Sequence, residues 1–321
     1  MCLHLKELGL PYKAVHLATG WESAETDVYL NDYLPTVIGP ITILRAEVNL
    51  NADQLELAQK YETRLGVKYS AMVRFIIKKG MFPTRVMRWC TRELKIIPIK
   101  KFLTEMDDEP INAIGIRGAE SARRAAQDEW EWNKTYDCDV WRPIHSWSLQ
   151  DVINIHHRHG IAPNPLYLSG SERVGCWPCV FARKDEIVRM ADQSPERIDL
   201  IEALEAEVLI LANARYASRG ETPESLGYGK PGWFMNPSRS KRTVTRDLPV
   251  EAPDMFGNVP PTTITKEVVD CNPWSIRDVV AYARSKKKTD QVELFAGNAR
   301  DAGCMRWGLC DTGSRAVSWE E

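Results

Sequence analysis

Two cysteines three positions apart carry the strongest chemical signal in this sequence. Cys176 and Cys179 lie in the segment Gly-Cys-Trp-Pro-Cys, in which the glycine and the proline favour a tight turn that points both sulfurs at one spot. Such a turn suits a metal ion or an iron–sulfur cluster. The same spacing occurs in thiol–disulfide pairs, so the motif alone leaves both chemistries open.

A third cysteine lies in a basic segment much earlier in the chain. Arginines and a lysine surround Cys90 between residues 81 and 95, among them Arg88 and Lys95. Cationic surroundings of this kind hold anions and lower the pKa of a thiol, so the segment can serve phosphate, sulfate or a thiolate. The alternative is a solvated basic face of a helix.

Two further segments follow predicted strands. Thr19-Gly20-Trp21-Glu22 comes after a strand at 13–18, and Arg117 ends a strand at 110–116. Ligands of open α/β sheets collect at the carboxyl ends of strands, where a guanidinium can grip an oxyanion. Glu120 can orient such an arginine, with Arg123 or Arg124 on the other side of a phosphate. Ordinary turn chemistry and a surface salt-bridge helix are the alternatives.

The elements that must position these residues alternate between strands and helices. A second strand is predicted at 41–46, and helices are predicted at 51–65 and 69–79, each stopped by a glycine. The longest helix is predicted to begin at Ser194-Pro195 and to stop at Gly220. Residues 1–8 read as the second half of a helix, so we expect the chain to begin downstream of its own phosphate loop.

Composition sets the class of protein and its compartment. The chain has 321 residues, 44% of them hydrophobic, a net charge of −2 and eight cysteines. It has no signal peptide and no apolar run of membrane length, so we expect a cytoplasmic protein with no membrane partner and with cysteines that favour metal over disulfides. A long loop is expected over 221–265, where the basic run Arg239-Ser240-Lys241-Arg242 can touch nucleic acid or simply be solvated.

Taken together, these motifs resemble the phosphoadenosine phosphosulfate reductase family, within the adenine-nucleotide α-hydrolases that carry a pyrophosphatase loop. The matching segments are Thr19-Gly20-Trp21-Glu22, Arg88-Trp89-Cys90-Thr91 with Lys95, Gly115-Ile116-Arg117 with Glu120 and Arg124, Trp141-Arg142-Pro143-Ile144, and Gly175-Cys176-Trp177-Pro178-Cys179.

The resemblance implies an α/β fold, a doubly wound, mostly parallel Rossmann-like sheet over 1–190, with a helical and loop-rich extension over 191–321. It implies an adenine nucleotide, either phosphoadenosine phosphosulfate or ATP, bound by Thr19, Gly20, Trp21, Arg88, Lys95, Arg117, Glu120, Arg124 and Arg142. It also implies a four-iron, four-sulfur cluster held by Cys90, Cys176 and Cys179, for which zinc is the alternative.

The sequence departs from the family at three places. A Ser-Gly-Gly-x-Asp-Ser phosphate loop is absent, and Trp89-Cys90 stands where the cluster-bearing reductases have two adjacent cysteines. A fourth ligand must therefore come from elsewhere, with Cys310 as first choice and Cys304 as second. The segment that carries the reductases' nucleophilic thiol is also absent, so we expect Cys304 or Cys310 to supply that thiol.

Three functions remain open at this point. In the first, the protein reduces an adenylyl sulfate to sulfite with a thioredoxin-like thiol donor. In the second, it releases pyrophosphate from ATP and passes sulfur to nucleic acid through the cluster. In the third, it is a degenerate protein that binds zinc or a nucleotide without turnover.

Overall fold

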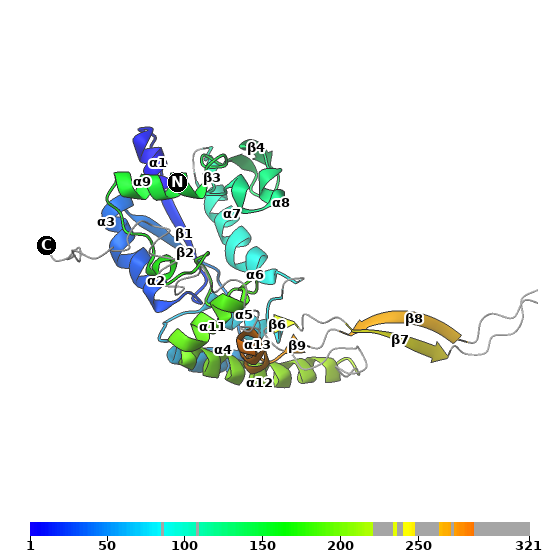
Figure 1. Ribbon diagram of the computed structural model, residues 1–321. Coiled ribbons are helices and arrows are strands. Elements are labelled where there is room, and N and C mark those ends of the chain that lie inside the picture. The colour runs from blue at the N-terminus through cyan, green and yellow to red at the C-terminus, as the bar shows by residue number, and fades with distance from the viewer. Residues whose placement is uncertain are drawn as a thin grey trace, which may run out of the picture.

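The computed structural model describes residues 1–84, 87–106, 109–220, 234–235, 240–247, 263–270 and 273–285. It shows a helix-rich α/β fold, as the sequence predicts (Figure 1). Strands β1 (Ala14–Ala18) and β2 (Ile41–Arg45) pair in parallel, with Ala14 opposite Ile41. Both strands lie where the apolar runs place them.

A second sheet has the strand order β3-β5-β4. Strand β3 (Asn112–Ala113) pairs in parallel with β5 (Cys138–Trp141), and β4 (Trp130–Asn133) pairs with β5 in an antiparallel hairpin. The predicted strand at 110–116 is thus much shorter than expected, and β4 was not predicted. The parallel pairs of the described residues belong to two small sheets.

Helices make up most of the rest of the described chain. Their bounds are α1 Cys2–Glu7, α2 Ala24–Val28, α3 Leu34–Ile38, α4 Ala52–Leu65, α5 Ala71–Lys79, α6 Trp89–Thr91, α7 Ile97–Thr104, α8 Ala122–Ala125, α9 Leu149–Arg158, α10 Pro165–Leu168, α11 Lys184–Gln193, α12 Pro195–Ala217 and α13 Ile276–Ser285. Two π-helical turns, η1 (Tyr29–Tyr33) and η2 (Arg92–Ile96), and a 3₁₀ turn, η3 (Gly118–Glu120), connect some of them.

Local signals account for several helix ends. Asn51 caps α4 in a capping box with Gln54, and Gly66 ends that helix in the left-handed conformation. Ser148 and Asp151 form a capping box at the start of α9, in which the Asp151 carboxylate accepts hydrogen bonds from the Ser148 N–H and hydroxyl at 2.7 Å each. Gly80 ends α5 in the same left-handed conformation.

One buried cluster unites the helical side of the molecule. Many of its members come from α4, α5, α11, α12 and α13, together with Trp89 of α6 and with Trp21 and Trp177 of the connecting segments. Figure 1 shows α12 along one side of the fold with α11 and α13 beside it. The domain boundary at 190/191 stays a prediction, although this cluster contains residues from both sides of it.

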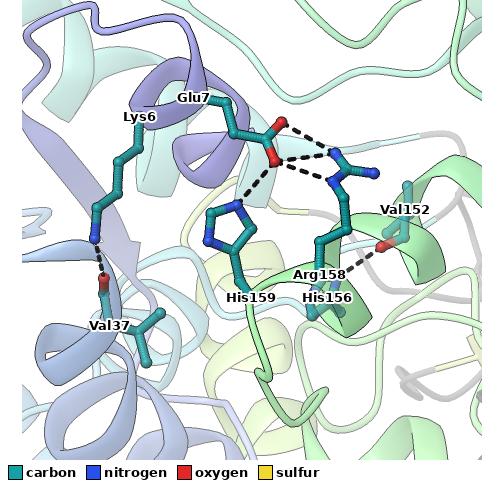
Figure 2. A network of polar contacts seen from close by, with 7 residues as sticks. All are labelled: Lys6, Glu7, Val37, Val152, His156, Arg158 and His159. Atoms are coloured by element: carbon teal, nitrogen blue, oxygen red, sulfur yellow. Dashed lines mark hydrogen bonds and ion pairs between the residues drawn. The ribbon is translucent and has the colours of Figure 1, made fainter.

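Helix α1 is fastened to α9 by charge. Arg158 donates hydrogen bonds to both carboxylate oxygens of Glu7 at 3.0 Å, and the His159 Nε2 lies 2.9 Å from the same carboxylate. Lys6 reaches the carbonyl of Val37 at the end of α3 at 3.5 Å (Figure 2). The first helix is thereby tied to two elements distant in sequence.

The expectation of a structureless loop at 221–265 was wrong in part. Strands β6 (Phe234–Met235) and β7 (Ser240–Asp247) lie within it, and β8 (Thr263–Asp270) begins there. Strand β7 pairs with β8 in antiparallel fashion, and β6 pairs with β9 (Pro273–Trp274). The β-branched run Thr243-Val244-Thr245 is the strand signal that the prolines and charges around it concealed. Within the described part of the chain, no helix combines the length and apolar character needed to cross a membrane.

Candidate functional site

A tight polar turn follows β1. The Thr19 N–H and hydroxyl donate to Oε1 of Glu22 at 3.0 and 2.7 Å, and the Trp21 N–H donates to Oε2 of the same carboxylate at 3.0 Å. Thr19, Trp21 and Glu22 are all buried. Glu22 therefore closes the turn from within, since its carboxylate satisfies backbone groups that the strand leaves behind.

Glycine is required at the second position of this turn. Gly20 has a φ of +67°, and a Cβ added there would lie 2.5 Å from the Cα of Ser70 and 2.6 Å from the carbonyl oxygen of Tyr69. The Met72 N–H donates to the Thr19 carbonyl at 3.0 Å. The turn therefore lies directly against the amino end of α5.

The Cys-x-x-Cys segment docks onto the same turn. The Trp177 N–H donates to the carbonyl of Trp21 at 2.8 Å, and the Cys176 sulfur lies 3.7 Å from the Thr19 hydroxyl. Arg197 of α12 covers the other side, because its guanidinium lies over the Trp21 ring at 5.0 Å and donates to the Glu22 carbonyl at 3.1 Å. Three distant segments thus converge at the end of β1.

The three predicted thiols influence one another's protonation. Burial raises the pKa of Cys90, and nearby Cys179 raises it further, whereas Lys95 opposes both effects. Burial raises the pKa of Cys176 to about 12, with the charge of Lys95 opposing this and the charges of Glu22 and Cys179 adding to it. Cys90 and Cys176 are therefore protonated and poorly nucleophilic unless a cation holds them as thiolates.

The predicted metal site is not complete in the described part of the chain. Among the residues that the structure describes, no three His, Cys, Asp or Glu side chains are arranged to hold a metal ion. Cys304 and Cys310, expected as fourth ligand and nucleophile, lie outside the described residues. The described donors alone thus do not make a complete site for a cluster, and no chemical step is derived through one.

A cluster of arginines lies beyond β3. Glu120 forms ion pairs with Arg117, at 3.4 Å, and with Arg124. Burial lowers the pKa of Arg124, and the charges of Arg173 and Arg117 lower it further. Arg117 and Arg124 therefore share one carboxylate, and the charge of a third guanidinium, Arg173, acts on Arg124; this arrangement favours a second anion.

The segment that carries Cys176 and Cys179 also connects the arginine cluster to the turn after β1. Arg173 lies near Arg117 and Arg124, and Cys176, three residues later, lies against Thr19. Burial raises the pKa of Tyr167, while a backbone hydrogen bond with Val174 and the charges of Arg117 and Arg173 oppose that shift. The run from 173 to 179 therefore leads from the arginines to the sulfurs.

Some predicted residues do not join the arginine cluster. Arg142 is buried, and its guanidinium donates to the Asp128 carbonyl and to Oε1 of Glu131, each at 2.6 Å. It fastens β4 to β5 and has no open side for a phosphate. Arg88 is exposed, with its guanidinium over the Phe181 ring at 4.9 Å and a hydrogen bond to Thr91 at 3.3 Å.

Sequence reasoning missed three polar residues of the site. Arg173 lies three residues before Cys176, and its place near that motif was the available signal. Arg197 lies in the first turns of α12, where an arginine that packs inward has no sequence signal of its own. Burial lowers its pKa to about 10, although the charges of Glu196 and Glu22 act to raise it. Burial also lowers the pKa of His16 in β1. The charge of Glu22 opposes this shift, and the charge of Lys95 adds to it.

The fold and site define a helix-rich α/β protein with arginines and thiols gathered at strand ends. Residues 2–182 match the phosphoadenosine phosphosulfate reductase domain, which is more than half of the chain. The chain belongs to this family, and the resemblance seen in its motifs is confirmed.

Known relatives differ in how much they share with this chain. An uncharacterized 37.8 kDa protein of Escherichia phage 186 is 33% identical over 239 residues, which are 65% of this chain and 71% of that protein. The adenosine 5'-phosphosulfate reductase of Salinibacter ruber is 31% identical over 85 residues, 26% of this chain and 32% of the reductase. That of Streptomyces coelicolor is 37% identical over 67 residues, 21% and 28% of the two chains. The chain thus spans about a third or less of each of these two reductases.

Proposed function

We propose that this protein is an enzyme that binds an adenylyl sulfate and reduces it to sulfite with a thiol donor. The observation that carries the proposal is the pairing of Arg117 and Arg124 with Glu120, with Arg173 near Arg124 at one end of the segment that holds Cys176 and Cys179. Membership in the reductase family supports the same substrate class.

The arginines have a defined part in the proposed reaction. Guanidinium groups bind sulfate and phosphate through paired N–H donors, and they balance the negative charge that grows on the leaving phosphate. A thiolate attacks the sulfur of the adenylyl sulfate, the sulfur–oxygen bond to the phosphate breaks, and adenosine 5'-phosphate, or its 3'-phosphorylated form, leaves with the bonding electron pair.

A thiol donor completes the turnover. The S-sulfocysteine left on the enzyme is attacked at its cysteine sulfur by a donor thiolate, so sulfite leaves and a mixed disulfide forms. A second thiol of a thioredoxin-like donor then releases the enzyme and is itself oxidised. Cys304 and Cys310 remain the predicted source of the attacking thiol, and the pKa of Cys176 argues against its serving as a free nucleophile.

The cofactor stays a separate proposal. Cys179 lies close enough to Cys90 and to Cys176 for its charge to raise the pKa of each, as expected of donors to one metal or cluster. When bound, a cation there supplies positive charge that keeps the thiols deprotonated. The expected four-iron cluster, or zinc in its place, therefore requires at least one donor in addition to these three.

Product analysis tests the proposed activity. The anaerobically purified full chain is incubated with adenosine 5'-phosphosulfate or its 3'-phosphorylated form, together with reduced thioredoxin. Sulfite formed in a thiol-dependent manner is the expected result. In a parallel incubation with ATP, release of pyrophosphate without sulfite from either sulfonucleotide would instead support the sulfur-transfer alternative. If neither product forms, the remaining function is nucleotide or zinc binding without turnover.

A further inference from the structure

The three-stranded sheet carries an aromatic face apart from the proposed site. In the β4–β5 hairpin, Trp130 lies opposite Trp141 and Trp132 lies opposite Asp139. Directly opposed residues of an antiparallel pair share one face of the sheet. The three tryptophans and Asp139 therefore lie on the same side, and we call these four residues the tryptophan face.

The other side of the hairpin is packed into the protein. Cys138 and Val140 of β5 are buried there, and Glu131 of β4 is ion-paired with buried Arg142 at 2.6 Å. The tryptophan face, in contrast, is open: Trp130 is 49% exposed and Trp132 is 61% exposed. Solvated tryptophans beside one another are unfavourable unless a partner covers them.

The rings are already arranged for binding. Trp130 and Trp141 stack with centroids 5.0 Å apart and planes 12° from parallel. The Nε1 of Trp141 donates to the Glu129 carboxylate at 3.3 Å, which fixes the orientation of that ring. The stack therefore presents a rigid indole surface that needs little ordering when a partner arrives.

Charge decides which partner fits. Between residues 128 and 139 the chain has acidic residues at 128, 129, 137 and 139 and a single basic residue, Lys134, besides Glu131, which is ion-paired on the other side of the hairpin. In the described part of the chain, cations lie over other rings but none lies over Trp130, Trp132 or Trp141. An acidic rim repels nucleic acid and anionic lipid, and open indole faces attract cations most strongly among side chains.

Strand β4 also offers a free edge. The sheet order β3-β5-β4 leaves β4 with one neighbour among the described strands. An extended peptide can add to such an edge through its backbone and place alternate side chains on one face.

We propose that the tryptophan face binds an extended, arginine- or lysine-rich segment of a partner protein. The partner segment adds to the edge of β4, and its cationic side chains lie over the indoles of Trp130 and Trp132 and beside the carboxylate of Asp139. This surface is independent of the nucleotide chemistry proposed above.

Peptide binding to the full chain tests the proposal. The probes are a fluorescein-labelled peptide of alternating arginine and threonine, a matching glutamate and threonine peptide, and a single-stranded oligothymidylate, followed by fluorescence anisotropy. The arginine peptide should bind, and more tightly at low salt. Trp132→Leu, which keeps an apolar side chain but removes the indole, should weaken its binding about tenfold, and Asp139→Asn about threefold.

A matched control and three outcomes make the test decisive. Trp147→Leu alters a tryptophan outside the face and should leave binding unchanged, and unaltered urea midpoints show that each variant is folded. Equal binding of the arginine peptide by wild type and Trp132→Leu overturns the proposal. Preference for the oligothymidylate or the glutamate peptide also overturns it, as does a concentration-dependent dimer that Trp132→Leu abolishes.

Discussion

The hydroxyl of Thr19 lies 3.7 Å from the sulfur of Cys176, although 157 positions separate the two residues in sequence. The same hydroxyl donates to Glu22 at 2.7 Å. One buried oxygen thus joins the turn after β1 to the Cys-x-x-Cys segment. This contact places the thiols at the carboxyl end of a parallel strand, where α/β proteins bind their ligands.

Removing that hydroxyl should loosen the turn. Thr19→Val keeps the shape of the side chain but deprives the buried Glu22 carboxylate of one donor, so we expect a loss of about 2 kcal/mol in the free energy of unfolding. Urea titration monitored by circular dichroism measures it. Thr19→Ser retains the hydroxyl and should cost only about 1 kcal/mol for the lost methyl group. Equal losses in the two variants would show that the hydroxyl contributes nothing.

Two glycines with nearly the same backbone angle offer a matched comparison. Gly20 has a φ of +67° and Gly9 a φ of +68°, but a Cβ at Gly9 meets no atom within 4 Å. Gly9→Ala should therefore cost only the strain of the left-handed conformation, about 1 kcal/mol. Gly20→Ala adds a clash with the backbone of Ser70 and should cost about 3 kcal/mol or more. Thermal unfolding of both variants decides whether close packing at Gly20 has the predicted effect.

Metal content should depend on the three gathered cysteines. Iron and zinc are measured on protein purified without oxygen, for wild type and for the serine variants of Cys90, Cys176 and Cys179. Each variant should lose most of the bound metal, because a thiolate ligand contributes strongly to affinity. Cys2→Ser, in α1, is the control and should keep the wild-type content. Full metal retention by all three variants would remove the cofactor proposal.

The amino end of the chain should show its own pH dependence. Hydrogen bonds from Arg158 and His159 lower the pKa of Glu7 below its ordinary value of 4.5. A carboxyl with a lowered pKa stabilises the folded state above the pKa it has when unfolded, and this stabilisation fades as the pH falls through the folded value.

The difference in unfolding free energy between wild type and Glu7→Gln should therefore be constant near neutral pH and shrink below about pH 4.5. Urea titrations from about pH 7 to about pH 3.5 measure it, and added salt should reduce it because both Glu7 and Arg158 are partly exposed. A difference independent of pH would indicate a packing effect.

Local patterns predicted the elements that depend on local chemistry. The strands at β1 and β2 follow apolar runs, and the helices α4, α5 and α9 begin or end at caps that can be read from a few residues. The contact between Cys176 and Thr19 was not predicted, because no local rule links residues so far apart in sequence.

Residues whose roles depend on tertiary partners escaped prediction. Arg142 was expected to face phosphate, but its charge is taken by Glu131, on a strand that the sequence analysis did not include. Burial of Arg197 depends on where α12 crosses the turn at Trp21, which periodicity alone does not give. In both cases the sequence does not reveal which residue the arginine contacts in the folded protein.

Arg173 gives the sharpest test of the anion site, because it has no part in the predicted motifs and lies beside both Arg117 and Arg124. Arg173→Ala should weaken binding of adenosine 5'-phosphosulfate about tenfold, the value of one charge-assisted contact to an oxyanion. Isothermal titration calorimetry at two salt concentrations measures the affinity, and the variant should show a shallower salt dependence than wild type. Arg123→Ala removes an exposed arginine next to Arg124 and controls for net charge. If both variants lose affinity equally, the effect belongs to the overall charge of the surface and Arg173 has no specific contact with the nucleotide.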